Sequence, residues 1–266
     1  MSQVLVNGVK IYYESYGTGD PLLLIEGLGY ASWSWFRQIE GFADSYRVVS
    51  FDNRGVGKSD KPDIPYSIEL MADDVARLLE SLSIEKAHIL GVSMGGYIAQ
   101  KLAIKYPHKV KSLVLGCTSF GGPQSIPLTA EALQSMLKVE GLNAEEVIRQ
   151  GFKVAISPEF VRAYPEVIDQ LVAWRLVNPT PRYAWERQFA AAAAFNAGSQ
   201  LDKIKAPTLV ITGSEDIVVP PQNSLMLAER IFGAQLVIIP GGGHLFFIEN
   251  AEEFNETVLE FLKGIV

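Results

Sequence analysis

The chain has 266 residues, of which 48% are apolar and 20% are charged, a composition typical of one globular α/β domain with room for an insertion. Its formal net charge of −7 argues against nucleic acid or an anionic membrane surface as a partner, because both bind basic patches. The single cysteine, Cys117, excludes an intrachain disulfide and a cysteine-rich metal site, and its place at the end of an apolar run indicates a small buried side chain.

The first residues follow a strand pattern and lack the basic and apolar regions of a signal peptide. The longest uninterrupted apolar run, residues 189–195, is too short to span a bilayer. We therefore expect a soluble, cytoplasmic protein that does not enter a membrane.

Strand and helix patterns alternate through the first half of the chain. An Asn-Gly pair at 7–8 joins two β-rich runs as a hairpin turn, and an amphipathic helix begins near Ser67. Apolar strand patterns occur at 22–25, 87–90 and 110–115, and another strand is expected at 47–51. Strands that are apolar on both faces and alternate with helices favour a mostly parallel sheet covered on both sides, with the opening hairpin at one edge.

The pattern changes after the Gly-Gly-Pro sequence at 121–123. Only helical periodicity follows, with helices expected at 130–137, 144–156, 159–176 and 183–195. Strands at 208–212 and 235–239 and helices at 221–231 and 251–265 then resume the earlier alternation. We therefore predict an α/β core formed by residues 1–121 and 200–266, interrupted by a helical cap insertion at 122–199.

A nucleophile elbow is indicated where the run at 87–90 meets the next helical pattern, which begins near Gly96. The residues at 91–95 are Gly-Val-Ser-Met-Gly, and glycine at both ends removes Cβ atoms that would collide with neighbouring backbone in so tight a turn. The turn holds Ser93 at its tip with the hydroxyl exposed, and the first N–H groups of the helix point the same way. Ser93 is therefore the candidate nucleophile.

A serine hydroxyl needs a base to take its proton, and the base needs a third group to orient it. Of the three histidines, His88 lies within a predicted strand and is expected in the core or at a sheet edge, whereas His108 is expected in an exposed loop. His244 follows the strand at 235–239, and loops at the carboxyl ends of parallel strands build the sites of open α/β sheets. His244 is therefore the candidate base.

The orienting acid should come from another such loop. Asp216 comes directly after the penultimate predicted strand, with Glu215 as the neighbouring alternative. The loop after 110–115 reads Gly-Cys-Thr-Ser and offers no acid. The order Ser93, Asp216, His244 along the chain is that of the α/β-hydrolases.

Four motifs carry a resemblance to a known family. They are GVSMGG at 91–96, DNRGVGKSD at 52–60, PTLVITGSED at 207–216 and GGGH at 241–244. The whole chain resembles α/β-hydrolase-fold enzymes with a helical cap, close to their carboxylesterase and 3-oxoadipate enol-lactonase-like members. The resemblance implies an α/β-hydrolase fold with a mostly parallel, eight-stranded sheet flanked by helices.

Acyl transfer also needs N–H donors for the oxyanion. The N–H of Met94, one residue past the nucleophile, is the first, and the resemblance places the second on Leu28. The chain has Glu26 and Gly27 where the family usually has His-Gly, and Gly27 preserves the close backbone approach. Glu26 is either a structural group hydrogen-bonded beneath the loop or a carboxyl near the site with a raised pKa. Asp52 and Arg54 are expected to form a structural turn and ion pair.

The helical insertion supplies side chains over the site. Most of its apolar residues are expected in its own core, and a minority line a pocket together with two residues from outside it. The predicted pocket residues are Trp33, Phe152, Trp174, Trp185 and Phe246. The arginines of the insertion are expected on a solvated helix face, unless one pairs with a substrate carboxylate. These arginines are Arg149, Arg162, Arg175, Arg182 and Arg187.

These residues predict a serine hydrolase that cleaves small to medium apolar carboxylic esters through an acyl-serine intermediate. Ser93 attacks, His244 moves the proton and Asp216 holds the ring, so no metal or organic cofactor is required. The expected partner is a small-molecule ester or lactone, and the oligomeric state stays open. The alternatives are lactone opening, C–C hydrolysis or cyanohydrin cleavage on the same triad, and a ligand receptor without turnover. A serine nucleophile argues against haloalkane dehalogenase and epoxide hydrolase chemistry, where the family has aspartate.

Overall fold

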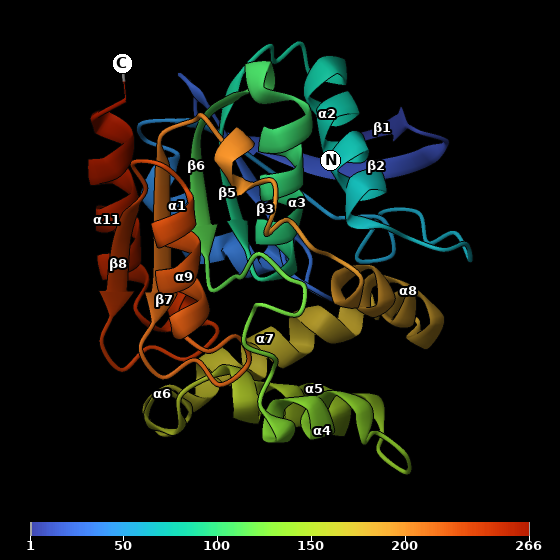
Figure 1. The fold of residues 1–266 in the computed structure, drawn as a ribbon. Helices are drawn as coiled ribbons and strands as arrows, with labels where there is room; N and C mark the ends of the chain where they lie inside the picture. The colour runs from blue at the N-terminus through green and yellow to red at the C-terminus, as the bar shows by residue number, and fades with distance from the viewer. Residues whose placement is uncertain (1, 266) are drawn as a thin grey trace.

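The computed structural model describes residues 2–265, which form an eight-stranded sheet with helices on both faces (Figure 1). The strands are β1 (Ser2–Val6), β2 (Val9–Tyr16), β3 (Pro21–Ile25), β4 (Arg47–Phe51), β5 (Ala87–Val92), β6 (Val110–Gly116), β7 (Thr208–Gly213) and β8 (Gln235–Ile239). Their order is β1-β2-β4-β3-β5-β6-β7-β8, with β1–β2 and β2–β4 antiparallel and the other neighbours parallel. The predicted fold, including the hairpin at one edge, is therefore confirmed.

The central strands are apolar on both faces because each face packs against different helices. The helices outside the insertion are η1 (Ser32–Trp35), α1 (Phe36–Phe42), α2 (Ile68–Ser81), α3 (Met94–Lys105), η2 (Pro107–Lys109), η3 (Leu201–Lys203), α9 (Gln222–Arg230), α10 (Phe246–Glu249) and α11 (Ala251–Lys263). In β3, Leu23 and Ile25 belong to the cluster that contains α2, α3 and α9. Leu22 and Leu24 point the other way and belong to the cluster that contains α1 and α11.

The chain between β6 and β7 folds into the helices of the predicted insertion. They are α4 (Ala130–Leu137), α5 (Ala144–Ala155), α6 (Pro158–Ala163), α7 (Pro165–Val177) and α8 (Arg182–Ala193). In Figure 1 they lie together beyond the carboxyl ends of the strands, where the arrowheads point. Their standing as a separate domain at 122–199 stays a prediction. Within residues 2–265, every helix falls short of the length and apolar character that crossing a bilayer requires.

The single helix predicted at 159–176 is wrong, because the chain forms two helices there, α6 and α7, that meet at Tyr164. Pro165 has no N–H to donate, and its ring disfavours helical backbone in the residue before it. Tyr164 accordingly has φ −133° and ψ 56°. Pro165 takes the first position of α7, where its missing N–H costs nothing. The apolar spacing alone does not predict this break in the helix.

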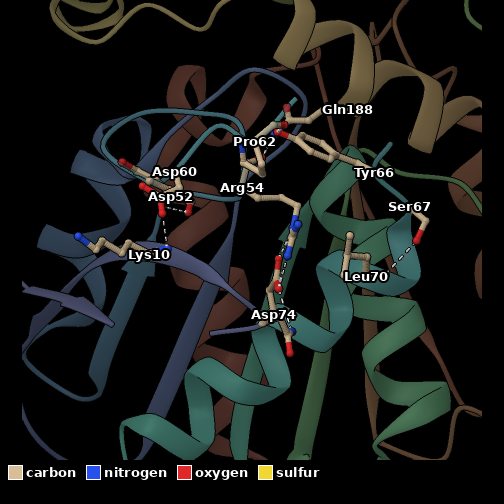
Figure 2. A network of polar contacts seen from close by, with 12 residues as sticks. Lys10, Asp52, Arg54, Asp60, Pro62, Tyr66, Ser67, Leu70, Asp74 and Gln188 are labelled. Atoms are coloured by element: carbon tan, nitrogen blue, oxygen red, sulfur yellow. Dashed lines mark hydrogen bonds and ion pairs between the residues drawn. The ribbon is translucent and has the colours of Figure 1, made fainter. Parts of the chain in front are cut away.

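The loop after β4 is held by a buried ion pair, which Figure 2 shows. Arg54 donates to both carboxylate oxygens of Asp74 on α2, at 2.5 and 2.7 Å. The predicted pairing of Arg54 with Asp52 is wrong. The Asp52 carboxylate instead accepts the N–H groups of Ser32 and Lys58, each at 2.7 Å. Burial raises the pKa of Asp52, and the two N–H groups oppose that rise.

Candidate active site

Ser93 lies at the tip of a sharp turn between β5 and α3. Its backbone has φ 54° and ψ −122°, a conformation that L residues rarely adopt, so the turn is strained. A Cβ at Gly95 would lie 2.1 Å from the carbonyl oxygen of Ile25, and one at Gly91 would lie 2.3 Å from that of Gly95. The steric reason predicted for both glycines is therefore confirmed.

Three loops bring a serine, a histidine and an aspartate together at the carboxyl ends of β5, β8 and β7. His244 Nε2 lies 3.1 Å from Ser93 Oγ, and His244 Nδ1 lies 2.7 Å from Asp216 Oδ2. The second carboxylate oxygen, Oδ1, accepts the N–H groups of Val218 and Val219, each at 2.8 Å. The carboxylate is thereby fixed so that it accepts a hydrogen bond from the Nδ1–H group, which leaves Nε2 as an acceptor for the Ser93 hydroxyl.

The loops that carry the acid and the base lie directly against each other. A Cβ at Gly213 would lie 2.2 Å from the carbonyl oxygen of Gly242, and the N–H of Glu215 donates to that same oxygen at 2.9 Å. The Glu215 side chain is exposed, whereas Asp216 is buried and bonded to the histidine. The geometry therefore favours Asp216 over Glu215 as the orienting acid.

Glu249 of α10 also belongs to this arrangement, although the sequence analysis did not single it out. Its carboxylate accepts the N–H of Gly243 at 3.1 Å and the N–H of Ser157 at 2.9 Å. It therefore links the loop that carries the base to the insertion. Burial raises the pKa of Glu249, against the hydrogen bonds from Ser157 and Gly243.

The loop after β3, residues 26–30, packs against the candidate nucleophile, and we call it the β3 loop. A Cβ at Gly27 would lie 3.0 Å from Ser93 Cβ and 3.4 Å from Ser93 Oγ, so glycine is what permits this approach. Within residues 2–265, the N–H groups of Leu28 and Met94 have no hydrogen-bond acceptor, and both residues line the cavity in front of Ser93. Two donors are thus available to a charge that develops beside the serine.

Glu26 is a carboxyl buried beneath the β3 loop. Its Oε2 accepts the N–H of Gly27 at 2.7 Å, and its Oε1 accepts the hydroxyl of Ser34. Burial raises the pKa of Glu26 to about 7, although these hydrogen bonds and the charges of His244 and Arg175 favour the ionised form. Glu26 therefore combines the two roles that the sequence left open, because it is hydrogen-bonded under the loop and also lines the cavity with a raised pKa.

The serine opens into a cavity of about 710 Å³ that is lined by residues of the core and of the insertion. Ser93, His244 and Glu26 contribute its polar groups near the sheet. On the side of the insertion, Trp185 and Phe189 of α8 line it with their rings stacked, 5.1 Å between centroids. A mainly apolar cavity of this size suits a small to medium organic ligand.

Comparison with known proteins decides the family. A family model described as alpha/beta hydrolase fold matches residues 20–251. The chain belongs to this family. The resemblance expected from the motifs is therefore confirmed for this alpha/beta hydrolase.

Relatives of this alpha/beta hydrolase are named for different substrates. The proposed carbamate hydrolase RutD of Azorhizobium caulinodans is 30% identical over 255 residues, which cover 96% of each chain. A 2-hydroxy-6-oxononadienedioate/2-hydroxy-6-oxononatrienedioate hydrolase of Burkholderia vietnamiensis is 33% identical over 268 residues, covering 96% of this chain and 91% of that one. The structure of the enol-lactonase from Burkholderia xenovorans has a TM-score of 0.87 and 25% identity, covering 98% of this chain and 100% of that one.

The predicted pocket residues of this alpha/beta hydrolase are only partly placed as expected. Trp185 lines the cavity. Trp33 and Trp174 instead line a separate hollow of about 170 Å³, and Phe152 and Phe246 are at most 1% exposed within the apolar core. Helical spacing identifies a side chain that faces inward, but it does not distinguish packed core from open cavity.

Arg175 is the arginine of the insertion that lines the cavity. Its guanidinium lies over the ring of Tyr30, 4.7 Å from the centroid, and it makes no ion pair with any carboxylate in residues 2–265. Arg149, Arg182 and Arg187 do pair with carboxylates at the surface, so the solvated helix face is confirmed for them. Arg175 therefore offers a positive charge to whatever enters the cavity. Tyr30 lines the same wall and was missed by the sequence analysis.

Among residues 2–265, one group of side chains has metal-ligand types close together. Ligand atoms of Cys117, Asp216 and His244 lie within 4.8 Å of one another. The aspartate and the histidine already bond to each other, and burial raises the pKa of the Cys117 thiol, which disfavours the thiolate that a metal binds. The group fits an acid–base pair packed against a buried thiol better than a metal site.

The two remaining histidines do not line the cavity. His88 is buried in β5 with Nδ1 2.7 Å from Ser112 Oγ, and burial lowers its pKa to about 4. His108 is exposed. The predicted positions of both histidines, in the core and at the surface, are confirmed.

Proposed function

We propose that this alpha/beta hydrolase cleaves carboxylic esters through an acyl-serine intermediate. The observation that carries the proposal is the continuous series of hydrogen bonds from Ser93 Oγ through His244 to Asp216. This series ends at a cavity whose size and lining suit small to medium apolar esters. In this proposal the helices at 122–199 act as a cap, because Trp185 and Phe189 on α8 line the cavity together with residues of the core.

In the proposed first step, Ser93 Oγ attacks the ester carbonyl while His244 Nε2 takes its proton, and Asp216 stabilises the imidazolium that forms. The N–H groups of Leu28 and Met94 stabilise the oxyanion. His244 then gives its proton to the departing alcohol and leaves an acyl-serine. Water attacks this acyl group as it loses a proton to the same nitrogen. The bond from the acyl carbon to Ser93 Oγ then breaks, His244 returns the proton to Ser93 Oγ, and the carboxylic acid is released.

Hydrolysis of p-nitrophenyl acetate, butyrate and octanoate by the wild type and by Ser93→Ala tests the proposal. We expect kcat/KM to fall by at least ~10⁴ in the variant, because the nucleophile is lost. Ser125→Ala is the matched control, since Ser125 also lines the cavity but its hydroxyl donates to the carbonyl of Gly122 at 2.8 Å. A folded wild type that neither turns over these esters nor takes up a fluorophosphonate at Ser93 would contradict the proposal.

A second candidate function is favoured by Arg175, namely hydrolysis of a substrate that carries a carboxylate, such as a carboxylated enol-lactone or a C–C cleavage substrate. An arginine that makes no ion pair within residues 2–265 and lies in a mainly apolar cavity can bind a carboxylate by charge-assisted hydrogen bonds. Two proteins similar to this chain are named as a hydrolase of a dioate and as an enol-lactonase.

A matched pair of esters separates the two candidates. Arg175→Gln should lower kcat/KM for p-nitrophenyl hemiglutarate about 10- to 100-fold, since a hydrogen bond to a charged group contributes about 1.5–3 kcal/mol. The same variant should leave p-nitrophenyl pentanoate nearly unchanged, and the surface variant Arg187→Gln should leave both unchanged. An equal loss on the anionic and the neutral ester would rule out a carboxylate-binding role for Arg175.

A further inference from the structure

One side chain of the insertion reaches the loops that surround the triad. Gln188 on α8 is 0% exposed and does not line the cavity. Its Oε1 accepts the N–H of Gly29 in the β3 loop at 2.9 Å, and its Nε2 donates to the carbonyl of Arg54 at 2.8 Å. Figure 2 shows Gln188 at one end of the polar network and Asp74 at the other, with Arg54 between them. A single amide thus joins the insertion to two loops of the sheet.

The Arg54 end of this bridge is anchored in the core. The guanidinium of Arg54 is bound by both oxygens of Asp74, and Asn7 Nδ2 donates to the same carboxylate at 2.9 Å. The neighbouring Asn53 donates from Nδ2 to the carbonyl of Glu26 at 3.1 Å, which connects the loop after β4 to the start of the β3 loop. The carbonyl of Arg54 is therefore a fixed point from which Gln188 acts.

The other end completes the hydrogen bonds of the β3 loop. The N–H groups of Gly27 and Tyr30 are bonded within the loop itself, whereas the N–H of Gly29 depends on Gln188. Within residues 2–265, the N–H of Leu28 is then the one donor of residues 27–30 that is left for a ligand. Among the N–H groups of residues 27–30, the one left unbonded is thus at the position where an oxyanion donor is needed.

Removing the amide would leave the N–H of Gly29 buried without an acceptor, an arrangement that folded proteins avoid. Gly29 has φ +73°, so the backbone beside Leu28 has the freedom to relax and satisfy that N–H elsewhere. Such a relaxation moves the adjoining Leu28 N–H, and a displacement of about 1 Å at a catalytic group can cost ~10²-fold in rate.

We propose that Gln188 is a positioning residue of the hydrolytic site, which holds the β3 loop so that the N–H of Leu28 faces the developing oxyanion. The inference rests on the function proposed above. The insertion then contributes to transition-state stabilisation through a side chain that never touches the substrate.

The test is Gln188→Met, which keeps the length of the side chain and removes both hydrogen bonds. With p-nitrophenyl butyrate we expect kcat to fall about 10- to 100-fold and KM to change less than about threefold, because the lost interaction acts on the transition state. A trifluoromethyl ketone, which forms a tetrahedral adduct with its oxygen in the oxyanion hole, should bind more weakly by a similar factor. Binding of butyrate, the product, should not change.

Two further variants make the result specific. Gln150→Met on α5 is the matched control, because Gln150 bonds only to the carbonyls of Ser135 and Lys138 within the insertion, and it should keep wild-type kcat. Gln188→Glu keeps an acceptor for the N–H of Gly29 and should retain more activity than Gln188→Met. If circular dichroism shows that the methionine variant is unfolded, the kcat of the folded glutamate variant tests the positioning role instead. A kcat below that of the wild type would support this role, and a wild-type kcat would overturn it.

Different outcomes overturn different statements. Wild-type kcat and ketone affinity in Gln188→Met, or a loss no larger than that of Gln150→Met, would overturn the positioning role while leaving the hydrolase proposal intact. A folded wild type without turnover or labelling at Ser93 would instead remove the proposed function on which the inference rests. A rise in KM with kcat unchanged would also overturn the inference, since it would assign Gln188 to substrate binding.

Discussion

Replacing Glu26 by glutamine should remove a pH dependence of folding stability that burial creates. Burial raises the pKa of Glu26 from 4.5 to about 7. Between these two values the unfolded chain has lost a proton that the folded protein still holds, so the free energy of unfolding of the wild type falls as the pH rises. Above the folded pKa both states are ionised and the fall is complete.

The magnitude follows from the two pKa values. The rise from 4.5 to about 7 corresponds to roughly 3 kcal/mol of unfolding free energy, since one pKa unit is about 1.4 kcal/mol. Glutamine fits the same partners, because its oxygen accepts the N–H of Gly27 and its amide donates to the hydroxyl of Ser34, which itself donates to the carbonyl of Ala31 at 2.8 Å. The substitution therefore removes the charge without leaving a buried group unpaired.

Urea unfolding of the wild type and of Glu26→Gln, from about pH 5 to about pH 8, measures this difference. We expect the free energy of unfolding of the glutamine variant, relative to that of the wild type, to rise with pH across that range until the variant is more stable by roughly 3 kcal/mol. Glu215→Gln is the control, because Glu215 is exposed in a neighbouring loop, and its difference from the wild type should stay small. A difference between Glu26→Gln and the wild type that does not vary with pH would refute the argument from burial.

Three further predictions concern the triad, the buried ion pair and the cavity. Asp216→Asn should lower kcat by about 10⁴ through the wrong histidine tautomer, and ester kinetics on the folded variant that match the wild type would exclude the triad. Asp74→Ala leaves Arg54 buried without its partner and should lower the free energy of unfolding by about 3–5 kcal/mol in urea, so a loss under about 1 kcal/mol would contradict the structure. Phe152→Ala should cost about 3–5 kcal/mol because it empties packed core, whereas Trp185→Ala should chiefly shift the preference among p-nitrophenyl esters toward longer acyl chains. Equal stability losses in these last two variants would be evidence against the distinction between core and cavity wall.

The arrangement of Ser93, His244 and Asp216 could be predicted because its constraints are local or topological. Gly91 and Gly95 lie within five residues of chain around Ser93 and predict the sharp turn there. The alternation of strands and helices predicts which loops share one edge of the sheet. Pro165 was an equally local signal for the break between α6 and α7. The prediction missed this break because the apolar spacing continues across it. The sequence thus contained a local signal wherever a rule of backbone chemistry applied, including at Pro165, where the prediction relied on apolar spacing instead.

The supporting contacts could not be predicted, because they join residues far apart in the chain. Gln188 and Gly29 are 159 positions apart, and Glu249 and Ser157 are 92 positions apart. Neither separation matches the period of a helix or a strand. The residues that flank Gln188 in the sequence therefore do not distinguish it from a glutamine that faces solvent. The cavity wall escaped prediction for a related reason, since an aromatic side chain has the same periodicity whether it meets packed neighbours or empty space.

The two ends of the insertion meet at one place on the sheet. Gly121 and Asn196 form an antiparallel bridge, and the N–H of Ala197 donates to the carbonyl of Phe120 at 2.8 Å. The strands on either side, β6 and β7, are direct neighbours, so the length and shape of the intervening segment can vary without a change in their register. If Gln188 positions the β3 loop as proposed, any other segment inserted at this place must again offer an acceptor to the N–H of Gly29.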